Sequence, residues 1–286
     1  MIKAIILDVD GVLVGSKPGF NFPDPNTQVT AALNQIRAKG IFISLCTGKP
    51  YFAIEKIIKD CQLDNIHITE GGAVIINPLQ KNVFQRHLID SEVATNLVRA
   101  LLSRRIYTEV YNSQDYLIQK SQSCLDIQEK HFYILGREPL VADDLALASK
   151  TAEISKIMPI VANQNEKDIV EEVFANFQDK LDLQWATHPT ALPLQFGVIT
   201  TKGVTKRQGA LDISEGLGVS LENTLGVGDS LMDWEFIEIC GYGAAMGNTS
   251  QELKDLIKTK PAERFYIGPS VDDNGILDIF QHFNLI

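Results

Sequence analysis

The sequence predicts an α/β protein, with a doubly wound parallel sheet into which a separate α+β unit is inserted. Three observations predict this fold. Short apolar runs alternate with helical segments near both ends of the chain, strands dominate in between, and polar residues follow several of the apolar runs. The length of 286 residues exceeds that of one typical domain, so we expect two domains.

The amino-terminal part alternates strand and helix from its first residues. Residues 5–9 form an apolar run broken only by Asp8, which is typical of a strand buried on both faces. Apolar residues between 29 and 36 then follow the i, i+3, i+4, i+7 spacing of one helical face. Further strands are predicted at 41–46, 66–69 and 73–76, with a helix at 50–61. This order is that of a doubly wound parallel sheet.

The pattern changes at about residue 81 and returns at Lys202. In between, strands are predicted at 83–88, 106–111, 116–119, 153–160, 181–186 and 192–200, with helices near 93–101 and 170–177, while 121–150 is ambiguous. This composition indicates helices backing an antiparallel sheet. Strand and helix alternate again from 204 to 283. We therefore predict a Rossmann-like core of residues 1–80 and 190–286, and an inserted α+β cap domain of residues 81–189.

The composition limits the classes of partner. A net charge of −10 and an isoelectric point near 5.0 argue against a nucleic-acid partner, because phosphate backbones bind basic faces. No apolar run approaches the about 20 residues that span a bilayer. The chain enters a strand with no leader segment, so we expect a cytoplasmic protein with no membrane partner. The sequence does not indicate an oligomeric state.

Polar side chains follow four of the predicted core strands, and a lysine precedes the helix after the insertion. In open α/β sheets, ligands bind beyond the carboxyl ends of the strands, where residues distant in sequence meet. Carboxylates as close as those of Asp8 and Asp10 repel each other unless a cation or a shared proton offsets their charge. The residues expected at this edge are Asp8, Asp10, Thr47, Lys202, Asp229 and Asn248.

This set of side chains suits phosphoryl transfer. A carboxylate can attack phosphorus and form a covalent intermediate. Mg²⁺ prefers carboxylate, phosphate and water oxygens. A lysine and a hydroxyl can balance the charge on the equatorial oxygens of the transition state. A second acid can protonate the leaving alkoxide and later activate water.

At these motifs the chain resembles the haloacid dehalogenase (HAD) superfamily. It is similar to the Cof-type phosphatases, which carry a large cap between the second and third motifs. The motifs are Asp8-Val9-Asp10-Gly11-Val12, Thr47-Gly48, Lys202-Gly203 and Gly228-Asp229-Ser230-Leu231-Met232-Asp233, and Ala245-Met246-Gly247-Asn248 fits the subgroup. The resemblance implies a Mg²⁺-dependent phosphomonoester hydrolase acting on a small phosphorylated metabolite such as a sugar phosphate.

The resemblance also implies a role for each matching residue. Asp8 would be the nucleophile that carries the phospho-aspartate, and Asp10 the general acid and base. The Mg²⁺ ligands would be Asp8, Asp229 and the backbone carbonyl of Asp10, with Asp233 in the outer shell. The residues that would bind the phosphate group are Thr47, Gly48, Lys202 and Asn248.

Two positions depart from the subgroup, and two alternatives stay open. Met232 stands where an asparagine is usual and cannot donate its hydrogen bond. Glu70-Gly71-Gly72 stands where Asn-Gly is common. One alternative is a phosphotransferase or mutase that passes the phosphoryl group to a sugar hydroxyl. The other is a non-catalytic binding module on the same scaffold, which Met232 alone supports.

Overall fold

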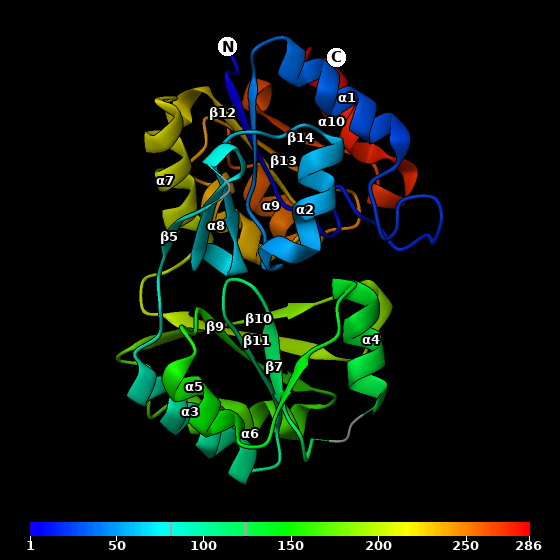
Figure 1. The fold of residues 1–286 in the computed structure, drawn as a ribbon. Coiled ribbons are helices and arrows are strands. Elements are labelled where there is room, and N and C mark those ends of the chain that lie inside the picture. Colours follow the sequence, from blue (N-terminus) through cyan, green and yellow to red (C-terminus); the bar gives the residue numbers. More distant parts are fainter. Residues whose placement is uncertain (81, 123–124) are drawn as a thin grey trace. The chain divides into compact units, whose positions relative to one another are not determined.

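The computed structural model describes residues 1–80, 82–122 and 125–286. The chain forms two compact units (Figure 1). Unit 1 comprises Met1–Thr47, Ile54–Phe84 and Thr205–Ile286, and unit 2 comprises Gly48–Ala53 and Gln85–Val204. Each unit has its own sheet, so the α/β core and the inserted α+β unit that the sequence predicts are both present.

The main sheet of unit 1 is parallel throughout. Its strand order is β14-β13-β12-β1-β2. The strands are β1 Ala4–Leu7, β2 Phe42–Leu45, β12 Thr224–Gly228, β13 Tyr242–Ala245 and β14 Phe265–Ile267. Every residue of β1 is buried, as expected for a strand covered on both faces. β1 pairs with β2 on one side and β12 on the other, so the chain order switches at β1, where open α/β sheets bind ligands.

Helices cover the sheet of unit 1, and a smaller sheet extends it. The helices are α1 Thr27–Ala38, α2 Tyr51–Asp60, α7 Lys206–Leu217, α8 Trp234–Ile237, α9 Gln251–Ile257 and α10 Gly275–His282. The smaller sheet has the order β3-β4-β5, with β3 His67–Thr69, β4 Val74–Asn77 and β5 Asn82–Arg86. Ile6 of β1 packs with Ala210 of α7 and Phe236 of α8 in one buried apolar cluster. This packing fixes the starts of α7 and α8 near the carboxyl end of β1.

Unit 2 is built on a mostly antiparallel sheet of order β10-β11-β9-β6-β7-β8. Its strands are β6 Tyr107–Tyr111, β7 Tyr116–Gln119, β8 Leu140–Ala142, β9 Lys156–Val161, β10 Leu181–Thr187 and β11 Gln195–Thr201. Its helices are α3 Ser91–Ser103, α4 Leu125–Leu135, α5 Leu145–Thr151 and α6 Gln164–Phe174. The ambiguous segment 121–150 thus contains α4, β8 and α5.

The second boundary of the insertion differs from the predicted one. Unit 2 extends to Val204, whereas the sequence placed the return to the core at residue 190. β11 lies between β10 and β9 in the sheet of unit 2 and pairs with both, which keeps residues 195–201 in that unit. A strand's partner is set by distant residues, so its own sequence did not show to which sheet it belongs.

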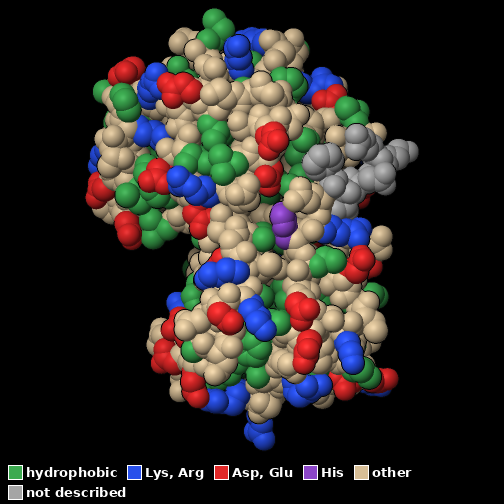
Figure 2. All heavy atoms as spheres, turned by 90° about the vertical axis from the view of Figure 1, so that its left-hand side faces the viewer, with side chains coloured by type: hydrophobic (Ala, Val, Ile, Leu, Met, Phe, Trp, Pro, Cys, Tyr) green, Lys and Arg blue, Asp and Glu red, His purple; other side chains and the backbone are tan. Residues whose placement is uncertain are grey.

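Short 3₁₀ helices connect these elements. They are η1 Glu70–Gly72, η2 Pro78–Gln80, η3 Pro189–Ala191, η4 Leu221–Asn223, η5 Leu231–Asp233, η6 Ala262–Arg264 and η7 Val271–Asp273. Among the residues described, no helix combines the length and apolarity needed to cross a membrane. On the face drawn in Figure 2, acidic and basic side chains are interspersed, and neither sign forms a continuous patch.

Candidate active site

The site is built where β1 and β12 end side by side. Leu7 pairs with Val227, and the backbone N–H of Asp8 donates to the carbonyl of Val227 at 3.0 Å. Asp8 and Asp229 therefore follow neighbouring parallel strands at the same edge of the sheet. A Cβ at Gly11, where φ is +77°, would lie 1.9 Å from Asp229 Oδ2. Only glycine fits the close approach and the positive φ there, so it lets the chain leaving Asp10 pass directly against Asp229.

Three carboxylates gather at this edge. One oxygen from each of Asp8, Asp229 and Asp233 lies within 4.8 Å of the others. Asp8 and Asp233 are buried, and Asp229 is half-buried. Carboxylates at this spacing repel one another, so their ionised forms require nearby positive charge.

Lys206 supplies positive charge inside this cluster. Its Nζ lies 2.9 Å from Asp8 Oδ1 and 2.6 Å from Asp233 Oδ1, and its side chain is only 4% exposed. Lys206 is the first residue of α7, directly after Thr205, whose side chain caps the helix by accepting from the N–H of Gln208. The helix start therefore fixes the backbone from which the ammonium reaches the cluster.

The sequence-based prediction of Lys202 for this position is wrong. Lys202 forms an ion pair with Asp182 at 2.7 Å within unit 2, and its side chain is 55% exposed. The two lysines lie four residues apart, and the Lys202-Gly203 pair is the one that resembles the family motif. The available signal was the cap: a threonine followed by a helical run places the helix start at Lys206 and not at Lys202.

Asp233 holds the turn that carries Asp229. Its Oδ2 accepts hydrogen bonds from the backbone N–H of Asp229 at 3.0 Å, and from both the N–H and the hydroxyl of Ser230 at 2.9 Å. Its Oδ1 accepts from Lys206. Both oxygens are thus engaged by protein donors, an arrangement that suits an outer-shell role. Met232 is half-exposed in the same turn, η5, whose ends are fixed by Ser230 and Asp233.

Asn248 contacts Asp229 in the structure, and the prediction that it binds phosphate stays a prediction. Its Nδ2 donates to Asp229 Oδ2 at 3.0 Å and to the carbonyl of Gly11 at 3.1 Å, while its Oδ1 accepts from the N–H of Val271 at 2.9 Å. Both hydrogens of the amide therefore have acceptors. Sequence reasoning placed Asn248 at the correct edge of the sheet but could not show which neighbour its amide would bind.

Thr47 lies just beyond the end of β2, at the same edge of the sheet in unit 1. It is buried, its N–H donates to the carbonyl of Ile68, and its carbonyl accepts from the N–H of Gly71, both at 3.0 Å. These bonds fix the backbone of Thr47, whose hydroxyl group is predicted to bind the phosphate. Gly48 is the first residue of unit 2, so the boundary between the units follows Thr47 directly.

Burial and repulsion raise the pKa values of the acids. Burial, the charge of Asp233 and that of Asp10 raise the pKa of Asp8 to about 7, although Lys206 acts in the opposite direction. Burial and the charges of Asp233, Asp8 and Asp10 raise the pKa of Asp229 well above its usual range. Burial lowers the pKa of Lys206, but Asp233 and Asp8 outweigh that effect and raise it well above its ordinary value. Lys206 therefore stays charged, but its single positive charge cannot balance the three carboxylates once all of them are ionised.

A divalent cation fits this excess of negative charge. Asp233 is committed to protein donors, so Asp8 and Asp229 are the side chains of the cluster that would hold the ion. Mg²⁺ is commonly held by one or two carboxylates, with water and phosphate oxygens completing an octahedron. The donor set is all oxygen, which is the chemistry that Mg²⁺ requires.

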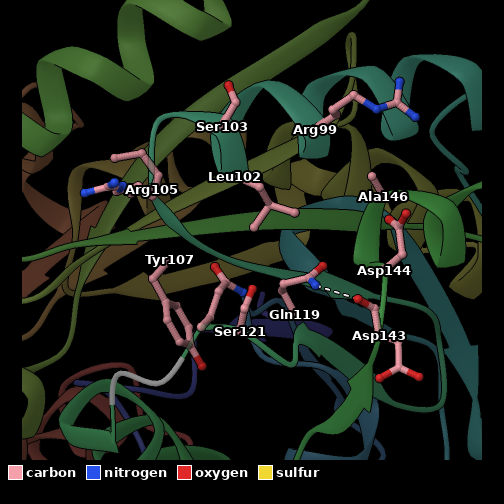
Figure 3. Close-up of a pocket in the computed structure, with 12 residues that line it drawn as sticks. Arg99, Leu102, Ser103, Arg105, Tyr107, Gln119, Ser121, Asp143, Asp144 and Ala146 are labelled. Carbon is pink, nitrogen blue, oxygen red and sulfur yellow. Dashed lines mark hydrogen bonds between the residues drawn. The ribbon is translucent and has the colours of Figure 1, made fainter.

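Unit 2 has a pocket of its own, with a volume of about 780 Å³ (Figure 3). Arg99, Arg105 and Asp144 are among the residues that line it, and Gln119 Nε2 donates to the carbonyl of Asp143 at 2.7 Å on its wall. The pocket includes none of the predicted site residues. The acid–lysine cluster at the edge of the parallel sheet is therefore the stronger candidate for chemistry.

The fold places three carboxylates and a lysine at the switch point of a parallel α/β sheet. The chain belongs to the haloacid dehalogenase-like hydrolases, whose family model matches residues 5–280. This confirms the family that the sequence motifs predicted.

Known relatives match over almost the whole chain. The phosphatase YwpJ of Bacillus subtilis is 25% identical over 300 residues, which cover 98% of this chain and 99% of that protein. The 5-amino-6-(5-phospho-D-ribitylamino)uracil phosphatase YwtE of the same species is 23% identical, with 96% of each chain covered. The solved structure of BT4131, a sugar phosphatase of HAD subclass IIB, superposes with a TM-score of 0.80 at 21% identity over 99% of this chain and 100% of that one.

Proposed function

We propose that this protein is a Mg²⁺-dependent phosphomonoester hydrolase that acts on a small phosphorylated metabolite, of which a sugar phosphate is one class. The observation that carries the proposal is the placement of Lys206 Nζ between Asp8 and Asp233, in one cluster with Asp229. The family membership and the name of the phosphatase YwpJ support phosphate-ester hydrolysis, and the names of YwtE and BT4131 point to small phosphorylated substrates.

In the first step, Asp8 is the nucleophile. One of its oxygens attacks the phosphorus atom, the bond from phosphorus to the substrate oxygen breaks, and Asp10 gives its proton to the departing alkoxide. The product of this step is an alcohol and a phosphoryl group bound to Asp8. Lys206 and the hydroxyl of Thr47 would stabilise the charge that develops on the phosphoryl oxygens.

In the second step, Asp10 takes a proton from water as that water attacks the phosphorus atom. The bond between phosphorus and Asp8 then breaks, which releases inorganic phosphate and restores both carboxyl groups to their starting states. Bound Mg²⁺ would supply charge neutralisation at Asp8 and at the transferring group. Asp233 would keep Lys206 and the Asp229 turn in place through both steps.

Hydrolysis can be tested on a panel of phosphate esters, with Mg²⁺ and with a chelator. We expect Mg²⁺-dependent release of phosphate from at least one ester and its loss in Asp8→Asn. Asp255→Asn is a matched control, because Asp255 lies on the surface of unit 1 and pairs only with surface side chains in the described residues. Turnover that survives Asp8→Asn contradicts the proposal, as does the absence of turnover with every ester.

Product analysis separates hydrolysis from phosphoryl transfer. A hydrolase releases one inorganic phosphate for each alcohol formed, even when a sugar acceptor is present. A phosphotransferase or mutase would instead form a new phosphate ester from the acceptor, at the expense of free phosphate.

A further inference from the structure

Asp272, in η7 near the end of the chain, binds the loop that follows Asp10. Its Oδ1 accepts from the backbone N–H of Ser16 and from Asn21 Nδ2, both at 2.9 Å, and its Oδ2 accepts from the hydroxyl of Ser16 at 2.6 Å. Three donors from one loop therefore converge on a single carboxylate more than 250 residues away. All of these residues belong to unit 1.

The loop is packed closely against this carboxylate. Asn21 is buried, and its Nδ2 also donates to the carbonyl of Val271 at 3.1 Å. A Cβ on Gly15 would lie 2.3 Å from Asp272 Oδ1, so the backbone approaches as near as a glycine allows. Partial burial raises the pKa of Asp272, but hydrogen bonds from Ser16 and Asn21 outweigh it and hold that pKa below its usual value.

The same turn controls the amide that orients Asp229. The N–H of Val271, the residue before Asp272, donates to Asn248 Oδ1 at 2.9 Å. Asn248 Nδ2 donates to both Asp229 Oδ2 and the carbonyl of Gly11. Gly11 begins the loop that Asp272 holds further along. The other two partners of Asn248 are Gly11 and Val271. They lie on the two segments that Asp272 joins, namely the loop after Asp10 and η7.

We propose that Asp272 is a positioning residue for the cation site: it clamps the loop after Asp10 to the turn at Val271 and so fixes Asn248 against Asp229. The inference rests on the proposed Mg²⁺-dependent function. Within the described part of the chain, the hydrogen bonds of the Asp272 side chain go to Ser16 and Asn21 and not to Asp8 or Asp229, so its effect reaches the ion through Asn248 and the loop. Partners that orient metal-binding carboxylates in this way strengthen metal binding without touching the metal.

The test measures Mg²⁺ binding by isothermal titration calorimetry on the full chain without substrate. We expect Asp272→Ala to raise the dissociation constant about tenfold, as removal of such partners typically does. Asp272→Asn keeps an oxygen that can accept from the Ser16 N–H and the Asn21 amide, so we expect less than about a threefold change. Asp273→Ala is the matched control, because its side chain is 68% exposed and its ion pair with Lys17 spans 3.9 Å. We expect that variant to bind Mg²⁺ like the unmodified protein.

Several outcomes would overturn the inference alone. One is a folded Asp272→Ala variant, judged by circular dichroism and thermal unfolding, that binds Mg²⁺ as tightly as the unmodified protein. Another is an equal loss in Asp272→Ala and Asp273→Ala. If Asp272→Ala does not fold, Ser16→Ala provides the test, because it removes only the 2.6 Å contact. We expect it to raise the dissociation constant about twofold, since one hydrogen bond to a charged group is lost at a half-exposed site; no change overturns the inference.

The unmodified protein distinguishes this inference from the function on which it rests. If it does not bind Mg²⁺, the proposed function and the role of Asp272 fail together. If it binds Mg²⁺ and hydrolyses phosphate esters while the Asp272 variants behave like the control, the role of Asp272 fails and the proposed function stands.

Discussion

The ammonium of Lys206 lies 2.6 Å from Asp233 and 2.9 Å from Asp8, so one buried cation bridges the predicted nucleophile and the acid that holds the Asp229 turn. A buried charge costs several kcal/mol to desolvate and persists only with close partners. The three residues therefore act as a unit, and a change at any one of them alters the other two.

Replacing Lys206 by methionine should remove most of the activity. The lost ammonium is expected to lower kcat by about 10²- to 10³-fold, the usual effect of removing one stabilising group from a transition state. The variant should also lose about 3 kcal/mol of stability, because Asp8 and Asp233 remain buried without their cation. Steady-state kinetics and chemical denaturation measure the two effects. Lys202→Met is the matched control and should retain activity. A comparable loss of kcat in that variant would show that Lys202 takes part in the reaction.

Asp8→Asn should abolish turnover and stabilise the protein in the absence of metal. The pKa of Asp8 is about 7 in the folded state, against an ordinary value of 3.8 for an aspartate side chain. Between these pH values the folded protein holds a proton that the unfolded chain has lost, so the contribution of Asp8 to the free energy of unfolding falls as pH rises from about 4 to 7. Above pH 7 Asp8 is ionised in both the folded and the unfolded chain, and the full free-energy cost of burying its charge lowers the stability.

The neutral asparagine removes that cost. We expect the metal-free Asp8→Asn protein to be more stable than the unmodified protein by about 1 kcal/mol or more at pH 8, with the gain vanishing near pH 4. Thermal unfolding with a chelator across this pH range measures it. A loss of stability at pH 8 would show that Asp8 is stabilised in its ionised form by Lys206 more strongly than burial opposes it.

Mg²⁺ binding should weaken as pH falls below 7. A carboxylate must lose its proton before it can bind a cation, and the raised pKa of Asp8 places that competition near neutrality. With one competing proton on a group whose pKa is about 7, the dissociation constant should rise about fivefold between pH 7 and pH 6, and the raised pKa of Asp229 adds to this rise. Calorimetric titration at each pH measures it, and affinity that stays constant from pH 6 to pH 8 contradicts the expectation.

Met232→Asn should leave activity intact or raise it. η5 is held at its ends by Ser230 and Asp233, so the side chain at position 232 is not needed to form the turn. Asparagine would add a hydrogen-bond donor that methionine lacks. Comparison of kcat/KM for the two proteins on the same ester measures the effect. A large loss of activity would show that the methionine itself is required.

Much of the site could be predicted from the sequence because parallel strands bring their carboxyl ends to one edge. Asp8 and Asp229 each follow an apolar run, and β1 and β12 do lie side by side. Lys206 was missed because two lysines four residues apart both precede or open a helix, and the motif at Lys202 was read without its cap. The structure identifies Lys206 as the lysine of the cluster, because the two lysines differ in position by about one turn of helix.

The remaining errors concern contacts between distant segments. Asn248 was placed at the correct edge, but its three partners come from the turn after β12, the loop after Asp10 and η7. The extent of unit 2 was misjudged because β11 pairs with β10 and β9. Neither the hydrogen bonds of one amide nor the neighbours of one strand follow from local periodicity.

The chain re-enters unit 1 at Thr205, one residue before Lys206. The helix cap at Thr205 lies in unit 1, and Glu235 Oε2 accepts the backbone N–H of Lys206 at 3.1 Å from that same unit. The backbone of Lys206 is therefore held by residues of unit 1, and neither of these two contacts comes from unit 2. Exchange of residues 85–204 for the corresponding segment of a relative should therefore leave the ammonium of Lys206 where it is, because both of these contacts come from unit 1.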